Sequence, residues 1–283
     1  LSLDDIGRAF HAADLARVGN RTVRLVTVVV KPYESPFGVF DDATIRREFA
    51  GDSRELLERV EPPADITVER DLVVGRSVAD GLVSTVEDSN PAALVVGWEG
   101  PTSRVDALLG TTLDTLVARA RCDLYVERVG PEANGVESIL LPVAGGPHVG
   151  TAARIAAAIA DQNDARVVVL SVAGADDDGI DADDAAAFAD AGERAFAERD
   201  VPDTPVETVV QEGADVADVI AAEAADHDLL VLGATRQGAV RTRIVGSVPR
   251  RVVDRSDRTV ILARSGDTAA GPPGLFGRIA RRW

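Results

Sequence analysis

The chain has 283 residues, 46% of them hydrophobic, and a formal net charge of −17 at pH 7. This length suits two domains of about 130 residues each, and the negative charge excludes non-specific nucleic-acid binding as a function, because the overall field repels phosphate backbones. A single cysteine, Cys122, rules out an intrachain disulfide framework and indicates a reducing, cytoplasmic compartment, where we expect it to be a small buried residue. No apolar run reaches the roughly 18 residues of a membrane span.

The acidity has a particular composition. Aspartate outnumbers glutamate, and Lys31 is the only lysine among 30 basic residues. A composition of this kind is typical of halophilic proteins, whose concentrated salt screens the repulsion between like charges. An acidic surface that binds a partner is the alternative interpretation.

The first half of the sequence alternates amphipathic stretches with short apolar runs. This alternation is typical of parallel strands joined by crossover helices. In chain order we expect a helix from about Asp4 to Val18, strands at 24–30 and 66–74, a helix entered at Gly75, and strands at 94–97 and 123–128.

The second half repeats this order with one additional strand at its start. The acidic stretch from Ala175 to Asp184 predicts a solvated loop that runs into a helix start, with metal binding as the weaker alternative. In chain order we expect a strand at 137–143, a helix from about Thr151, strands at 166–172 and 206–210, a helix entered at Gly213, and strands at 230–233 and 259–264.

A glycine frame occurs twice, 136 residues apart. The frames are Gly97-x2-Gly100-x9-Gly110-Thr111 and Gly233-x12-Gly246-Ser247. In each, an apolar run ends in glycine, a loop follows, and a Gly-Ser/Thr step opens the next helix, an order that presents backbone N–H groups to a phosphate. The sequence therefore predicts an α/β fold of two tandem doubly wound parallel-sheet domains, each with a ligand site at the carboxyl ends of its strands.

The domain boundaries follow from turn-forming residues. The final residues, 275–283, form a short basic amphipathic end that can touch a membrane surface or a partner, or else a frayed tail. We expect a first domain at 1–129, a linker at 130–136, a second domain at 137–265 and a flexible tail at 266–283.

The first domain lacks the strand that opens the second. It begins directly in its first helix, so about a dozen residues of strand and loop have no counterpart. In a doubly wound sheet the first strand is central, and its loss exposes two strand edges. We interpret the chain as the C-terminal part of a longer polypeptide, or as one with a misplaced start. A four-stranded variant of the domain is the alternative.

Together these features resemble the universal stress protein family. The resemblance rests on the glycine frame, the strand Ile139-Leu140-Leu141-Pro142-Val143 and the helix entries at Gly75 and Gly213, and it covers nearly the whole chain as two tandem modules. It implies an adenine nucleotide alpha hydrolase-like fold with strand order 3-2-1-4-5, and a bound nucleotide in some members. It also implies pairing through the last strands, 124–128 and 259–264, which would make the tandem an internal pseudo-dimer.

The resemblance implies a site for ATP or another adenine nucleotide, with Mg²⁺, and each domain departs from it differently. The first keeps its loop glycines, but the segment that would carry the family's ribose-side Asp is absent, and Glu99 and Asp106 oppose a triphosphate. The second has Arg236 in place of a glycine and Ala144 in place of the Asp. The expected site residues are Pro142, Val143, Ala144, Val172, Gly233, Ala234, Arg236, Gly238, Gly246, Ser247 and Val248 in the second domain, and Gly97, Gly100, Gly110 and Thr111 in the first.

The second domain also reverses the charge of the chain locally. From Leu229 to Val253 there is no acidic residue, while five arginines occur, at positions 236, 241, 243, 250 and 251. These arginines either bind phosphate groups or pair with Asp and Glu across the domain interface. His148 lies in the loop after the first strand, as a ligand contact or as a surface residue. His11 and His227 stand in helical patterns and are expected to be structural.

Three functions remain open. The first is a tandem stress-type regulatory module that binds an adenine nucleotide and signals through dimer geometry. The second is the C-terminal regulatory domain of a membrane transporter encoded upstream, on the cytoplasmic face of the membrane. The third is a scaffold that pairs with itself and binds no ligand. No P-loop, nucleophile elbow or metal-binding spacing is present in the sequence, so we do not expect an enzyme, a catalytic residue or a metal site.

Overall fold

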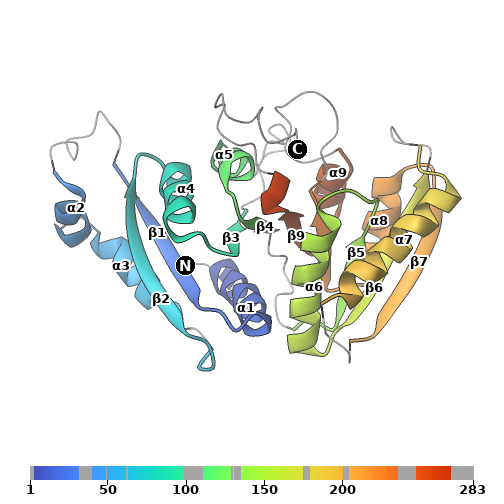
Figure 1. Cartoon of the computed structure of the whole chain (residues 1–283), viewed down its shortest axis with the longest axis horizontal. Helices are drawn as coiled ribbons and strands as arrows, with labels where there is room; N and C mark the ends of the chain where they lie inside the picture. The colour runs from blue at the N-terminus through green and yellow to red at the C-terminus, as the bar shows by residue number, and fades with distance from the viewer. Residues whose placement is uncertain are drawn as a thin grey trace, which may run out of the picture.

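The computed structural model describes residues 3–31, 40–48, 50–61, 63–98, 111–128, 130, 135–174, 179–199, 204–234 and 247–268. In this part of the chain, two α/β halves lie side by side and meet along strands near the middle of the molecule (Figure 1). The first half comprises α1 (Leu3–Val18), β1 (Val23–Val30), α2 (Asp42–Glu48), α3 (Gly51–Glu58), β2 (Val68–Gly75), α4 (Val78–Ser89), β3 (Ala93–Gly97), α5 (Thr111–Arg119) and β4 (Asp123–Arg128).

The second half repeats the plan and adds a strand at its start. Its elements are β5 (Ser138–Pro142), α6 (Val149–Asn163), β6 (Arg166–Gly174), α7 (Ala182–Ala197), β7 (Val206–Gly213), α8 (Val216–Ala224), β8 (Leu229–Gly233), α9 (Ser247–Arg255), β9 (Thr259–Arg264) and a 3-10 turn at Gly266–Thr268.

The second half forms the predicted doubly wound sheet. Its strands run in the order β7-β6-β5-β8-β9, which is 3-2-1-4-5 in chain order, and all four neighbouring pairs are parallel. β5 lies at the centre, with Ile139 opposite Val167 on one side and Leu229 on the other. Because helices cover both faces, β5 is continuously apolar from Ile139 to Pro142 rather than alternating, as is typical of a buried parallel strand.

The first half is divided where its central strand would stand. β1 and β2 form a separate two-stranded parallel sheet, while β3 pairs with β4. Within the described residues no strand lies between β1 and β3. The expectation that this half lacks the strand equivalent to β5 is therefore confirmed.

Antiparallel pairing of β4 with β9 joins the two halves. The register places Tyr125 opposite Ala263 and Val126 opposite Leu262, and the result is a seven-stranded sheet, β3-β4-β9-β8-β5-β6-β7. This confirms the predicted pairing of the last strands. Apolar clusters on both faces of this sheet combine residues of the two halves, for example Leu124 with Leu262 on one face and Tyr125 with Ile261 on the other.

Two arginines reinforce this junction reciprocally. Arg128, at the end of β4, donates hydrogen bonds to the carbonyls of Val253, in the last turn of α9, and of Ser256 and Arg258 beyond its end. Arg264, 136 residues later at the end of β9, donates to the carbonyls of Ala120 (2.6 Å) and Cys122 (3.2 Å), beyond the end of α5. Because 136 residues also separate Ala120 from Ser256, the contacts obey a two-fold relation. Each half supplies the cation that satisfies the other half's helix terminus.

The same symmetry fixes the backbone on either side of the junction. The N–H of Gly130 donates to Oγ1 of Thr259, and the N–H of Gly266 donates to Oδ1 of Asp123, both at 3.0 Å. A Cβ atom at Gly130 would lie 2.6 Å from the carbonyl oxygen of Asp257, and one at Gly266 would lie 2.8 Å from the carbonyl carbon of Cys122. Both positions therefore require glycine, because the two backbone segments that meet there approach too closely for a side chain.

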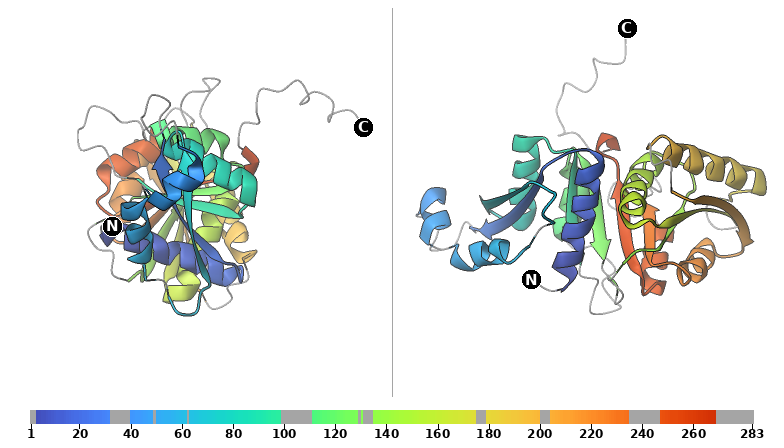
Figure 2. Two further views of the ribbon diagram at one scale, coloured as in Figure 1. Left: turned by 90° about the vertical axis from the view of Figure 1, so that its left-hand side faces the viewer. Right: turned by 90° about the horizontal axis from the view of Figure 1, so that it is seen from below.

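Helix α1 packs against α6 across the junction, and the two helices lie together in Figure 2. Nδ1 of His11 on α1 lies 2.7 Å from Oε1 of Glu127 on β4, where the Glu127 side chain is 1% exposed. Burial alone would lower the pKa of His11, but the hydrogen bond and negative charge of Glu127, with a further contribution from Asp14, outweigh it and raise that pKa. The expectation of a structural role for His11 agrees with this contact.

Several local features differ from expectation. Helices α2 and α3, between β1 and β2, had no predicted counterpart. His227 is buried but follows the end of α8 instead of lying within a helix. The acidic stretch does run into a helix start as expected, because the Asp181 side chain caps α7 by accepting a hydrogen bond from the N–H of Asp184 (2.8 Å). Cys122 is buried, as predicted.

Replacing Arg264 with methionine should lower the free energy of unfolding by about 2–4 kcal/mol, because two buried carbonyls lose a charged donor. The matched control is Arg47→Gln, since the Arg47–Glu48 pair is 68% and 56% exposed. That change should stay within about 0.5 kcal/mol. Urea denaturation at fixed high salt measures both free energies. Equal effects of the two substitutions would contradict the stabilising role of the Arg264 hydrogen bonds across the junction.

The His11–Glu127 contact predicts a pH dependence. Because the folded state raises the pKa of His11, the contact adds stability that is fully present below the ordinary histidine pKa of about 6.5. That stability is lost as pH rises through the raised value. The difference in unfolding free energy between the wild type and His11→Gln should therefore be largest at low pH. Urea titrations between about pH 5.5 and 9 measure it, and a constant difference would contradict the assignment.

Candidate functional site

The candidate site lies at the carboxyl ends of β5 and β8 in the second half. β5 connects to α6 and β8 to α9, and because β6 and β8 flank β5 on opposite sides, the connections diverge at this point. Diverging connections leave a crevice at the carboxyl edge of a parallel sheet, which is where doubly wound folds bind ligands. The structure thus brings the ends of two predicted site segments to one edge.

The predicted site residues of the second half divide into a buried floor and a more accessible rim. Val143, Val172 and Ala234 are buried at 4–5% exposure. Their side chains support the strand ends instead of facing solvent; the N–H of Val143 continues the sheet by donating to the Leu170 carbonyl (2.8 Å). The rim consists of the more accessible residues Pro142, Ala144, Gly233, Ser247 and Val248.

Some predicted residues cannot be placed. Arg236, Gly238 and Gly246, like Arg241 and Arg243, lie outside the described residues. In the first half, Gly97 ends β3 and Thr111 begins α5, while Gly100, Gly110, Glu99 and Asp106 lie outside the described residues.

A glycine pair shapes the loop between β5 and α6. Gly145 and Gly146 have φ angles of +73° and +87°, a region that favours glycine. A Cβ atom at Gly145 would also lie 2.7 Å from Cε1 of Phe188 on α7. The loop can therefore turn tightly from β5 into α6 and keep its backbone close to the carboxyl edge. The Gly-Gly doublet directly after an apolar strand is a signal from which these site-shaping residues could have been identified.

His148 anchors the start of α6 and is not a surface residue. Its side chain is buried, and Nδ1 accepts a hydrogen bond from the backbone N–H of Ser265, just beyond β9, at 3.1 Å. A Cβ atom at Gly233 would lie 3.3 Å from the Cβ of His148, so the residue does pack against the end of β8. Because Nδ1 accepts, the neutral ring carries its proton on Nε2. The surface alternative considered for His148 is thus wrong.

Arg250 and Arg251, the two described arginines of the segment from Leu229 to Val253, lie near acidic side chains. Arg251 lies 2.8 Å from Asp215, the residue that caps α8, and this partner lies in the same half, not across the interface. The cap bond from the Asp218 N–H, followed by the charges of Arg251 and Arg255, lowers the pKa of Asp215. Arg255, one turn further along α9, lies 2.9 Å from Asp218, and the equivalent pair of the first half, Arg119 with Asp80, lies at 3.2 Å, so this second ion pair belongs to the repeated architecture.

The helix starts of the two halves differ in charge. α9 begins at the exposed Ser247 and has no acidic residue in its first turn. In contrast, α5 carries Asp114 in its first turn. Burial raises the pKa of Asp114, against the opposing charge of Arg250 from the other half. Since helix N-termini attract anions, the second half is better suited than the first to a phosphate group.

Other kinds of site find no support among the described residues. No group of three or more His, Cys, Asp or Glu side chains is placed there to hold a metal ion. None of the helices in the described segments combines the length and apolarity needed to cross a bilayer.

Comparisons with solved structures show the same tandem architecture. A universal stress protein from Archaeoglobus fulgidus DSM 4304 aligns over 94% of this chain and 94% of its own, with 17% identity and a TM-score of 0.61. A functionally unknown protein from Pseudomonas aeruginosa PAO1 aligns over 91% and 88%, with 18% identity and a TM-score of 0.56. The cytoplasmic domain of a prokaryotic cation chloride cotransporter aligns over 92% and 94%, with 12% identity and a TM-score of 0.50.

Sequence comparison assigns the family. No curated protein matched the chain. The profile of the universal stress protein family matches twice, at residues 8–128 and 135–264, so the two matches coincide with the two halves seen in the structure. The chain therefore belongs to the universal stress protein family, as a tandem of two family modules.

Proposed function

We propose that this chain is a regulatory module that binds ATP or another adenine nucleotide, with Mg²⁺, in its second half. One observation carries the proposal: in the second half, β5 brings a glycine loop to the carboxyl edge of the sheet, beside Gly233 and the start of α9, whose first turn carries no acidic residue. In the first half, no such loop lies next to Gly97 among the residues that the structure describes.

The phosphate groups would lie at the start of α9. Ser247 carries a hydroxyl at this position, and the first turn of a helix directs its backbone N–H groups toward the N-terminal end, here without an acidic residue in that turn. Phosphate oxygens accept such bonds strongly because both the charge and the helix dipole favour them. In a chain of net charge −17, this local relief from repulsion is what permits an anionic ligand.

The base and ribose would lie beside the end of β5. There Ala144 is exposed and carries only a methyl group, so the described rim offers backbone groups to the sugar instead of a carboxylate. Hydrogen bonding that depends on a carboxylate is therefore missing. We expect binding to depend more on the number of phosphates than on the identity of the base.

We propose no catalytic activity for the site, and a cytoplasmic location. Burial raises the pKa of the Cys122 thiol to about 11, so this residue stays protonated and is not a nucleophile. His148 is engaged by the Ser265 backbone at Nδ1 and serves to anchor α6. A sensor needs only a binding equilibrium that changes the conformation or partner affinity of the module.

Thermal melting with ATP, ADP, AMP and GTP plus Mg²⁺, in high salt, tests the proposal. A nucleotide at about 100 times its dissociation constant should stabilise the protein by about 2.7 kcal/mol, seen as a rise of a few degrees in Tm. ATP should bind more tightly than AMP, and GTP should bind within about tenfold of ATP, which corresponds to about 1.4 kcal/mol.

The control uses the repeat itself. Ser247→Asp places a carboxylate where the phosphate would bind and should abolish the shift, whereas Thr111→Asp at the equivalent position of the first half should leave it unchanged. A shift in Tm that is lost in Thr111→Asp but kept in Ser247→Asp would place the nucleotide in the first half and contradict the proposal. The absence of any shift would favour a ligand-free scaffold.

A second candidate function is the regulatory domain of a membrane transporter. Its support is the fold likeness to the cotransporter cytoplasmic domain, which extends over both halves of this chain. Reading the gene upstream of the codon for Leu1 tests it: membrane spans in the same frame favour this function, and an in-frame stop codon contradicts it. In either case a homodimer would need a surface other than the last strands, because β4 and β9 are both paired within the chain.

A further inference from the structure

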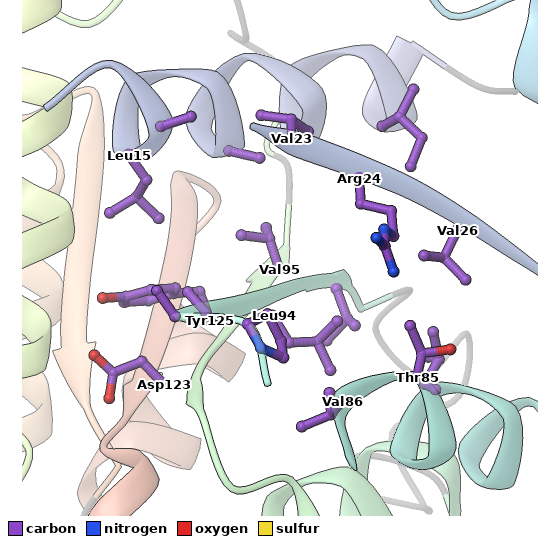
Figure 3. A pocket seen from close by; sticks show the side chains of 18 of the residues that line it. Leu15, Val23, Arg24, Val26, Thr85, Val86, Leu94, Val95, Asp123 and Tyr125 are labelled. Atoms are coloured by element: carbon purple, nitrogen blue, oxygen red, sulfur yellow. The ribbon is translucent and has the colours of Figure 1, made fainter. Parts of the chain in front are cut away.

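A large cavity opens between the two separated pieces of the first half. Its volume is about 1470 Å³, and it lies between the inner edges of β1 and β3. Figure 3 shows Leu15 of α1 on one side of it and Thr85 and Val86 of α4 on the other, with Val95 and Tyr125 between them. The cavity is therefore bounded by two strand edges and by helices from both layers of the fold.

The second half shows what fills the corresponding space. There β5 lies between β6 and β8, with Ile139 opposite both Val167 and Leu229. The equivalent positions in the first half are Val23 and Ala93: Val23 pairs with the first residue of β2 as Val167 pairs with the first residue of β7, and Ala93 precedes Leu229 by 136 residues. Both Val23 and Ala93 line the cavity.

Burial of the flanking strands differs accordingly between the halves. In the second half, β6 is buried at seven consecutive positions from Val167, and β8 is buried from Leu229 to Leu232. In the first half, the equivalent strands β1 and β3 contain no fully buried residue, although their sequences are as apolar. β1 and β3 thus have the apolar sequences of interior strands, but the described residues do not bury them.

In the described residues, the edges of β1 and β3 that face the cavity are not hydrogen-bonded to another strand. In the described part of the chain, β1 pairs only with β2 and β3 only with β4. A strand edge presents a row of N–H and C=O groups that another strand can satisfy, and burying them unpaired is costly. A small molecule fits this space less well, since typical ligand pockets measure about 300–1,000 Å³ and cannot satisfy two parallel edges at once.

We propose that this cavity receives a parallel β-strand of about the length of β5, apolar on both faces and joined to the N-terminal end of α1. The connection follows from the second half, where the residues from Val143 to His148 lead from β5 into α6. α1 and α6 are the equivalent helices, and they pack on each other across the junction. Alternate residues of the strand would face Leu15 on α1 and Val86 on α4, as Ile139 and Leu140 of β5 face opposite apolar clusters.

The protein's own strand provides the test. A copy of Glu137–Gly146 is fused ahead of Leu1 in the full chain, and amide hydrogen exchange is followed at the cavity edges of β1 and β3. Exchange of the amides around Val26 and Val95 should slow by at least about tenfold, because hydrogen-bonded interior strands open only in larger unfolding events. The control carries Leu140→Asp and Leu141→Asp within the fused copy.

The outcomes separate the proposal from its alternatives. Protection with the apolar copy but not with the control supports the strand site, provided that circular dichroism shows both proteins folded. The same ten residues added as a free, equimolar peptide should protect little, because fusion raises the effective concentration to about the millimolar range. Equal protection by the free peptide, or protection of the unfused chain only on dimerisation, would overturn the covalent source. No protection in the fused protein would overturn the strand site itself.

Discussion

The antiparallel pairing of β4 with β9 is the interaction on which the rest of the structure depends. It makes one sheet from strands of both halves, and it places the apolar faces of α5 and α9 in a shared cluster. Arg128 and Arg264 reinforce it by satisfying carbonyls that neither half satisfies alone. Burying a guanidinium is costly unless several acceptors meet it, so these arginines favour one register over its neighbours.

This junction allows the two halves to diverge. The second half has a five-stranded sheet and a helix start at Ser247 with no acidic residue in its first turn, whereas the first half carries an acidic residue at the start of α5 and, in the described residues, a divided sheet. Because β3 pairs with β4 and β4 with β9, these two strands of the first half are held by the second half, even though no strand lies between β1 and β3 in the described residues. The two halves thus share one sheet but differ in the charge at the equivalent helix start.

Much of the fold could be predicted from the sequence. Short apolar runs between amphipathic stretches, together with glycines repeated at 136 residues, predict the parallel strands and the missing strand, and the resemblance to the universal stress protein family implies their order. The contacts of the site could not be predicted in this way. Arg264 matches Arg128 in the repeat, but its acceptors are backbone carbonyls, which leave no trace in the sequence. Likewise, Arg251 pairs with a helix cap 36 residues away, and His148 is buried by the chain beyond β9.

The most direct test of the asymmetry between the halves is a crystal structure of the full chain grown with ATP and Mg²⁺ in high salt. We expect one nucleotide per chain, with its phosphates at the N-terminal turn of α9 and its sugar beside Ala144. No nucleotide should lie at the start of α5. A nucleotide in the first half, or equal occupancy of both halves, would contradict the account, because it would mean that the charge at the helix start does not decide where the ligand binds.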